Sequence, residues 1–299
     1  MKKNILCAFF LIILVMTGCS KESTIKTAKS LRIDFKNVPS IENASYELHL
    51  VKGEQRYPLK KFQVVDGKPV ELRNDKKIKV FQTERNILDF DAIEITIEPT
   101  KKKKGERSLL LSGEINSNGQ DITLKFAGIN LEGIEGQYML ATPTDEIAEN
   151  EESGVWFAKI EGEKMVPGLK IRPTQAGWSY EGWIEYKGKI TSLGRFGQPY
   201  GKDTIDTYSL RIFQPEIPGE DFIARVPNNF PILVNLATGD YKVSVSLEPD
   251  IDGNDPSDVN KPFFIILSSN IPNDLATKTP TPLEVMKDVP EATVTLEID

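Results

Sequence analysis

Short stretches in which apolar and polar residues alternate restrict the fold of this chain more than any other sequence feature. Five of them cover residues 31–35, 46–50, 93–97, 241–247 and 292–298. A period of two residues is typical of strands with one buried and one exposed face. Beyond the N-terminal segment no 11-residue window has a convincing helical period, and the chain carries 19 prolines and 21 glycines. We therefore expect an all-β protein.

The alternating segments recur in the second part of the chain in the same order as in the first. Six matches relate the two parts: Tyr46-Glu47 with Tyr180-Glu181, Lys52-Gly53 with Lys187-Gly188, Leu59, Lys61 and Phe62 with Leu193, Arg195 and Phe196, Ile97-Glu98-Pro99 with Leu247-Glu248-Pro249, 109–112 with 265–268, and 122–126 with 294–298. The offset between matched positions grows along the chain, as longer loops in the second copy require. This pattern predicts two tandem, homologous β-sandwich-like domains.

The predicted organisation has four parts. Residues 1–18 form a lipoprotein signal peptide, 19–30 a lipidated tether, 31–128 a first, divergent β domain, and 129–299 a second β domain with loop insertions. The insertions fall at 197–239 and 272–290, where Pro, Gly and Asp are frequent. This division assigns the final strand, at 292–298, to the second domain.

The N-terminal sequence predicts that the protein is located outside the cytoplasm. Lys2 and Lys3 precede an apolar run of about 12 residues, which is shorter than the roughly 20 that a spanning helix needs. The run Met16-Thr17-Gly18-Cys19 resembles a bacterial lipobox, with Met16 where Leu is usual. The resemblance implies cleavage before Cys19 and a lipid anchor on it. Ser20 after the cysteine resembles the outer-membrane sorting pattern of Gram-negative lipoproteins.

Composition excludes several kinds of function. Both cysteines lie in the first 19 residues and His49 is the only histidine, which argues against disulfides, Cys/His zinc sites, thiol nucleophiles and His-based triads. Cleavage of the signal peptide leaves 35 basic and 44 acidic residues, so nucleic acid is not an expected partner. The expected partners are the membrane, through the lipid on Cys19, and an unidentified envelope protein.

A series of motifs in the second copy resembles a known group of bacterial proteins. The series is Gly177–Trp183 (Gly-Trp-Ser-Tyr-Glu-Gly-Trp), 192–196 (Ser-Leu-Gly-Arg-Phe), 218–222 (Pro-Gly-Glu-Asp-Phe) and 245–249 (Val-Ser-Leu-Glu-Pro). It resembles secreted proteins described as anti-sigma factors, whose core is similar to the extracytoplasmic C-terminal domain of anti-sigma-K factors. The resemblance covers most of residues 136–298, and it implies a fold without catalytic residues.

The resemblance does not extend to capture of a sigma factor. An anti-sigma factor binds its target through a cytoplasmic helical domain joined by a membrane span, and the sequence contains neither. We therefore expect no direct contact with a sigma factor. The leading hypothesis is a non-enzymatic, lipid-anchored interaction or sensing module of the cell envelope. The alternative is a surface lipoprotein that binds calcium or carbohydrate.

Two groups of residues are candidates for ligand binding. Asp250, Asp252, Asp255 and Asp258 form an oxygen-rich loop directly after a strand, and Ca²⁺ takes six to eight oxygen ligands. The early Gly253 and the absence of a closing Glu do not match an EF-hand, so a solvated acidic loop is the alternative. Calcium is the only cofactor considered, and no other is expected.

Aromatic and polar residues complete the candidates. Trp178 and Trp183 suit an interaction face, for sugars or protein, although core packing explains them equally well. His49 falls on the polar phase of its strand and is predicted to be exposed. Glu220 and Asp221 are among many acidic residues from which a glycoside-hydrolase pair is conceivable, but nothing singles out a pair. An enzyme is therefore not expected.

Overall fold

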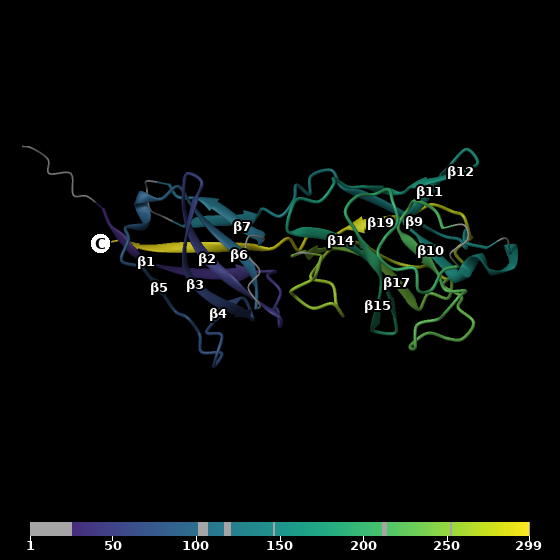
Figure 1. Cartoon of the computed structure of the whole chain (residues 1–299), viewed down its shortest axis with the longest axis horizontal. Coiled ribbons are helices and arrows are strands. Elements are labelled where there is room, and N and C mark those ends of the chain that lie inside the picture. The colour runs from purple at the N-terminus through teal and green to yellow at the C-terminus, as the bar shows by residue number, and fades with distance from the viewer. Residues whose placement is uncertain are drawn as a thin grey trace, which may run out of the picture.

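The structure is a computed structural model, and it describes residues 26–100, 107–116, 121–145, 147–210, 214–251 and 253–298. The predicted signal peptide and Cys19 lie outside these residues. The described chain is almost entirely antiparallel β-sheet, so the expectation of an all-β protein is confirmed (Figure 1). None of the helices in this part of the chain is long and apolar enough to cross a membrane.

The strands fall into two groups along the chain. The first comprises β1 (Ala28–Lys36), β2 (Ala44–Lys52), β3 (Gln55–Val65), β4 (Lys68–Val70), β5 (Phe81–Gln82), β6 (Ala92–Pro99), β7 (Ser108–Glu114) and β8 (Ile122–Phe126). The second comprises β9 (Glu135–Leu140), β10 (Gly154–Trp156), β11 (Ala158–Glu161), β12 (Lys164–Pro167), β13 (Leu169–Lys170), β14 (Trp178–Tyr186), β15 (Lys189–Phe196), β16 (Gly219–Asp221), β17 (Tyr241–Pro249), β18 (Phe264–Asn270), β19 (Thr281–Val285) and β20 (Glu291–Ile298). Two short 3₁₀ helices, η1 (Ile87–Asp89) and η2 (Ala148–Ser153), interrupt them.

The first sheet has nine strands in the order β4-β3-β2-β6-β7-β8-β20-β1-β5. It curls so that β1 approaches the β3–β4 turn, where the Phe35 amide donates to the Gly67 carbonyl at 3.0 Å. Gly67 has a φ of 70°, and a Cβ there would lie 2.6 Å from the Phe35 oxygen, so only glycine fits this close approach. Stacking of Phe35 on Phe62 closes the inner face.

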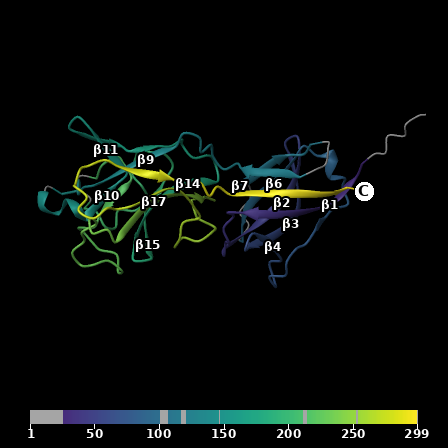
Figure 2. The same cartoon turned by 180° about the vertical axis from the view of Figure 1, so that it is seen from behind.

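The last strand of the chain belongs to the first sheet. β20 pairs along its length with β1 and, on its other edge, with β8 (Figure 2). The assignment of this strand to the second domain is therefore wrong. Its match with residues 122–126 is also wrong, because both segments lie in the first sheet and Val294 pairs directly with Ile122. The two sequences look alike because both segments are strands with one buried face and therefore share a period of two residues.

The second sheet also has nine strands, in the order β15-β14-β17-β18-β19-β9-β10-β16, with β13 paired to β9. Its first four strands repeat the order β3-β2-β6-β7 of the first sheet. The register shifts between Leu48 and His49 in β2 and between Gly182 and Trp183 in β14, positions that the sequence matches equate. It shifts again at the equivalent sites Ile95/Thr96 and Val245/Ser246.

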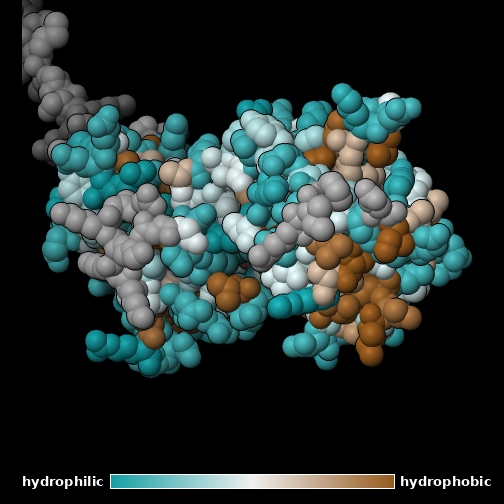
Figure 3. Space-filling view, turned by 45° about the vertical axis from the view of Figure 1, so that its right-hand side comes forward, coloured by the Kyte–Doolittle hydropathy of each residue, from teal (hydrophilic) through white to brown (hydrophobic). Residues whose placement is uncertain are grey.

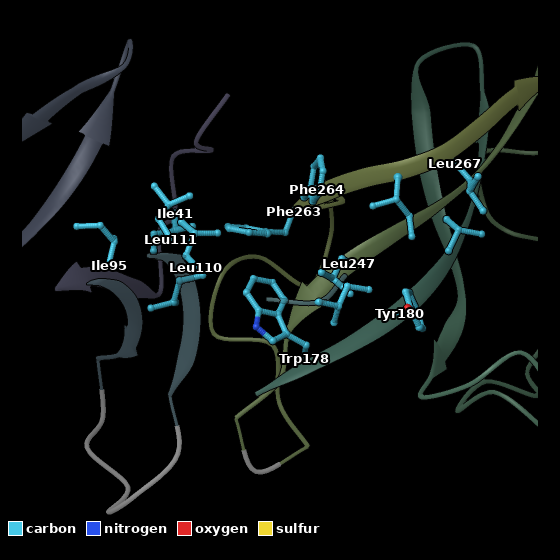
Figure 4. Close-up of a cluster of buried hydrophobic side chains, with 14 of the residues drawn as sticks. Ile41, Ile95, Leu110, Leu111, Trp178, Tyr180, Leu247, Phe263, Phe264 and Leu267 are labelled. Carbon is cyan, nitrogen blue, oxygen red and sulfur yellow. The ribbon is translucent and has the colours of Figure 1, made fainter. Parts of the chain in front are cut away.

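The two sheets share one continuous hydrophobic core. Figure 4 shows Leu110, Leu111 and other first-sheet side chains beside Trp178 and Phe263 at the junction of the two sheets. Phe126, at the end of β8, contacts Trp178 edge-on with ring centroids 5.6 Å apart. The Ser108 hydroxyl also donates to the Gly177 carbonyl at 2.5 Å. These contacts join the halves at their adjoining ends.

Candidate functional site

The aspartates of the predicted calcium loop do not converge. Asp255 accepts bonds from the amide and hydroxyl of Ser257, whereas Asp258 accepts from the Asn260 amide and pairs with Lys261. Asp250 lies 3.9 Å from the Arg195 guanidinium, and Asp252 lies outside the described residues. Asp255 and Asp258 thus accept bonds within local turns, and among the described residues Asp250, Asp255 and Asp258 form no three-ligand group.

The two candidate tryptophans are core residues, so the proposed aromatic face is wrong. Trp178 is 4% exposed and packs between Phe126 and Phe263 at the junction of the sheets. Trp183 is 1% exposed, and its Nε1 donates to the Ser246 hydroxyl at 2.7 Å. Both sit on β14, a central strand buried on both faces, which period-two alternation does not reveal.

Trp183 belongs to a buried polar cluster, which we call the second-copy cluster. Its members are Glu181, Trp183, Arg195, Ser246 and Glu248. Glu248 accepts from Ser246 and from the Phe263 amide at 3.0 Å, and Glu181 lies 3.8 Å from the Arg195 Nε. Burial raises the pKa of Glu181 to about 7 and the pKa of Glu248 well above its usual range.

An equivalent cluster occupies the same position on the first sheet. This first-copy cluster comprises Glu47, His49, Thr96, Glu98 and Arg107. The His49 Nε2 lies 2.9 Å from the Thr96 hydroxyl, which donates to Glu98 at 2.8 Å. The same nitrogen lies 3.5 Å from Glu47 Oε2 and 4.0 Å from Glu98 Oε1. It is the one set of three metal-ligating side chains found among the described residues.

His49 is not exposed, contrary to the prediction from its strand phase. It is 1% exposed, because β2 is a central strand of the sheet and is buried on both faces. Burial, together with the charges of Arg107, Arg56 and Lys61, lowers its pKa to about 4. The imidazole is therefore neutral at pH 7, and its Nδ1 has no hydrogen-bond partner among the described residues.

Glu220 and Asp221 form a third buried polar group, with no accessible surface. Asp221 accepts from Trp156 Nε1 at 2.5 Å and from the amide and hydroxyl of Thr144, and Glu220 accepts from Ser209. Burial raises the pKa of Glu220 to about 8 and that of Asp221 to about 6. These carboxyl groups tie β16 to β10 and to neighbouring loops.

The most exposed apolar surface of the described chain lies at the far end of the second sheet. Ile232 is 90% exposed and Leu233 89%, and both border a groove of about 540 Å³ that we call the end groove. Further apolar lining comes from Ile147, Leu210, Ile223 and Val226. Figure 3 shows a large brown patch on the second half of the molecule. Contiguous exposed apolar surface of this kind marks interaction sites.

The loop that carries Ile232 and Leu233 is held at both ends. On one side the Phe230 ring packs 5.3 Å from Tyr241 and 5.2 Å from Phe222, and Pro231 fixes the next backbone angle. On the other side Val234 is buried, and its carbonyl accepts from Ser153 at 2.7 Å. The two apolar side chains are thus presented between two anchored residues, which lowers the entropy cost of binding.

The charge of the end groove is acidic. Asp145, Glu149 and Glu152 line it, and no described basic residue does. None of the three forms a salt bridge with a described residue; Asp145 instead accepts from the Ile147 amide and the Asn150 side chain. The groove therefore combines apolar contact area with negative charge that no basic residue in the described part of its lining balances.

Sequence reasoning missed the end groove. The signal was the run Phe230-Pro231-Ile232-Leu233-Val234, in which apolar residues follow one another inside a segment otherwise rich in loop-forming residues. Such a run is usually a buried strand, and the sequence does not say which of its members face solvent.

Fold and groove together define an all-β protein with two antiparallel sheets and an apolar, acidic groove at one end. No family model matches the chain, and no curated protein or solved structure does.

Proposed function

We propose that this chain is a non-enzymatic, lipid-anchored interaction module of the bacterial cell envelope, and that the end groove is its docking site. The observation that carries the proposal is the near-complete exposure of Ile232 and Leu233 beside a groove of about 540 Å³. Burying two such side chains contributes roughly 1.5–3 kcal/mol each, which is enough for a specific contact.

The position of the groove suits an anchored protein. The predicted anchor, Cys19, precedes β1, and β1 begins at the end of the molecule opposite η2 (Figure 1). The groove is built from η2 and the loop that follows β16. A lipid on Cys19 thus leaves the groove pointing away from the point of attachment, where an envelope protein can reach it.

The chemistry of the groove specifies its occupant. Apolar walls accept aliphatic or aromatic side chains, and Asp145, Glu149 and Glu152 favour neighbouring positive charge. We infer an apolar segment of an envelope protein, flanked by Lys or Arg. Because negatively charged flanks face three carboxylates, they disfavour binding.

Two synthetic peptides test the proposal. Both have the same Leu/Ile/Phe core, one flanked by lysines and the other by glutamates, and their binding to the chain lacking residues 1–18 is measured by fluorescence anisotropy. The lysine-flanked peptide is expected to bind more tightly, with the difference reduced by salt. The double variant Ile232→Ser/Leu233→Ser is expected to weaken that binding about tenfold or more.

The control is Val259→Ser, which removes another exposed aliphatic side chain that does not line the groove. It should leave binding unchanged. Equal affinity for the two peptides, or equal effects of the double variant and the control, would overturn the assignment of the groove as a docking site.

A further inference from the structure

We propose that Glu47, His49 and Glu98 of the first-copy cluster form a binding site for a zinc ion. The site lies on the first sheet and is independent of the end groove. It joins β2, which supplies Glu47 and His49, to the neighbouring strand β6, which supplies Glu98.

The spacing of the three ligand atoms suits zinc. Tetrahedral coordination with bonds of about 2.0–2.2 Å places neighbouring ligand atoms about 3.4 Å apart. The His49 Nε2 lies 3.5 Å from Glu47 Oε2 and 4.0 Å from Glu98 Oε1, and all three atoms lie within 4.8 Å of one another. Small side-chain rotations complete the geometry, and a water molecule takes the fourth position.

The donor set selects the kind of metal. Imidazole nitrogen and carboxylate oxygen are both ligands that zinc takes, whereas calcium takes oxygen ligands alone. The two carboxylates balance the charge of a divalent ion. Both side chains are 16% exposed, so the site is open to an ion from solvent while His49 stays buried behind it.

Metal binding requires a change of tautomer at His49. The Thr96 hydroxyl donates to Glu98, so in the free protein it accepts from a protonated Nε2 of His49. When zinc binds to Nε2, that nitrogen gives its proton to solvent and Nδ1 takes one from solvent, so the ring stays neutral. Nδ1 has no hydrogen-bond partner among the described residues. No described donor to Nδ1 therefore holds the free ring in the tautomer that is protonated on Nε2.

The second-copy cluster lacks the ligand. Trp183 stands where the first copy has His49, and an indole N–H donates but does not ligate a metal. Its carboxylates are also closed off, with side-chain exposures of 6% for Glu181 and none for Glu248. The same backbone therefore supplies an internal control without the site.

Arg107 competes with the metal. Its guanidinium lies 3.9 Å from Glu98 Oε1 and is 39% exposed, so it is loosely held and free to withdraw. Zinc on Glu98 replaces this contact. Removing the positive charge in Arg107→Gln should therefore tighten zinc binding, because the ion no longer has to displace it.

A zinc titration of histidine-labelled protein tests the site. His49 is the only histidine of the chain, so nitrogen-15 histidine labelling of protein without a purification tag gives one imidazole signal. Saturating zinc should shift the Nε2 resonance and move the ring proton to Nδ1. Glu98→Gln should weaken binding about tenfold or more, a loss typical of removing groups around a bound metal. Glu181→Gln changes the second-copy counterpart of Glu47 and should leave zinc affinity unchanged, and circular dichroism confirms that each variant is folded.

Three results would overturn the site. The first is a His49 signal that excess zinc leaves unchanged. The second is equal zinc affinity in folded Glu98→Gln and Glu181→Gln. The third is an affinity that Arg107→Gln does not increase, and this variant decides the matter if Glu98→Gln does not fold.

Discussion

The two polar clusters are the same structural feature built twice with different side chains. In each copy a hydroxyl on the third strand of the set links an aromatic ring nitrogen to a carboxylate two residues further along, and the register shifts occur at matched positions. A tyrosine hydroxyl donates to a backbone carbonyl in both, at 2.6 and 2.8 Å. The matched members are Tyr46 and Tyr180, Glu47 and Glu181, His49 and Trp183, Thr96 and Ser246, Glu98 and Glu248.

The clusters differ in one ring and in their access to solvent. Trp183 fills its site and its hydrogen bond is fixed, whereas the smaller His49 leaves Glu47 and Glu98 partly exposed. The repeated backbone thus determines where the polar groups come together. The side chains determine whether that position is packed core or a site accessible to solvent. In the second copy the cluster is part of the packed core.

Removing the two rings should separate these roles most clearly. Trp183→Ala is expected to lower the free energy of unfolding by about 3–5 kcal/mol, because it opens a cavity in the core. His49→Ala removes a smaller ring and is expected to cost about 1–2 kcal/mol. Urea denaturation followed by circular dichroism measures both. Equal losses would mean that the two rings serve the same structural purpose.

The fall in stability with rising pH should come from the second copy, because burial lowers the pKa of His49 in the first copy and so acts in the opposite direction. Burial raises the pKa of Glu181 from 4.5 to about 7, so the folded state holds a proton that the unfolded chain releases. Stability therefore falls as the pH rises from about 4.5 to 7, by roughly 3 kcal/mol for this group. Glu220 and Asp221 add to the fall in the same direction.

Glu181→Gln tests that assignment. The neutral side chain cannot titrate, so the decrease in melting temperature between pH 5 and pH 8 should be smaller than in the parent protein. Glu284→Gln, on an exposed position of β19, is the control and should keep the full decrease. If both variants retain it, the pH dependence does not arise at Glu181.

The strands and the internal repeat were accessible from sequence because both follow from short-range patterns. Alternation marks β1 and β20, and the matches around Tyr46 and Tyr180 identify equivalent strands whose pairing order and register shifts agree. The partner of β20 was not accessible, because pairing across the sheet depends on long-range packing that a half-buried strand pattern does not encode.

The candidate site was harder to predict because burial of central strands breaks the rule of one buried and one exposed face. His49 and Trp183 both lie on such strands. From its place in the alternation His49 was predicted to be exposed, which is wrong, and the same pattern left a surface role open for Trp183. For Ile232 and Leu233 the error is the opposite one. A run of apolar residues is usually buried, and the sequence does not show that only the residues on either side of this pair are anchored in the core.

The smallest effect in the comparison concerns the arginine of each cluster. Arg195 donates to the Pro249 carbonyl at 3.0 Å and lies near two carboxylates, with its side chain 16% exposed. Arg195→Gln should cost about 1 kcal/mol. Arg107→Gln should change stability by less than about 0.5 kcal/mol, because its contact with Glu98 is long and solvated.

Urea denaturation at low and high salt distinguishes the two. Salt screens solvated pairs more than buried ones, so any loss in Arg107→Gln should vanish at high salt while that in Arg195→Gln persists. A loss at Arg107 as large as that at Arg195 would show that the first-copy cluster is also held together by its ion pairs. The accessible character that distinguishes it from the second would then be absent, since a guanidinium bound that firmly would not yield Glu98 to another cation.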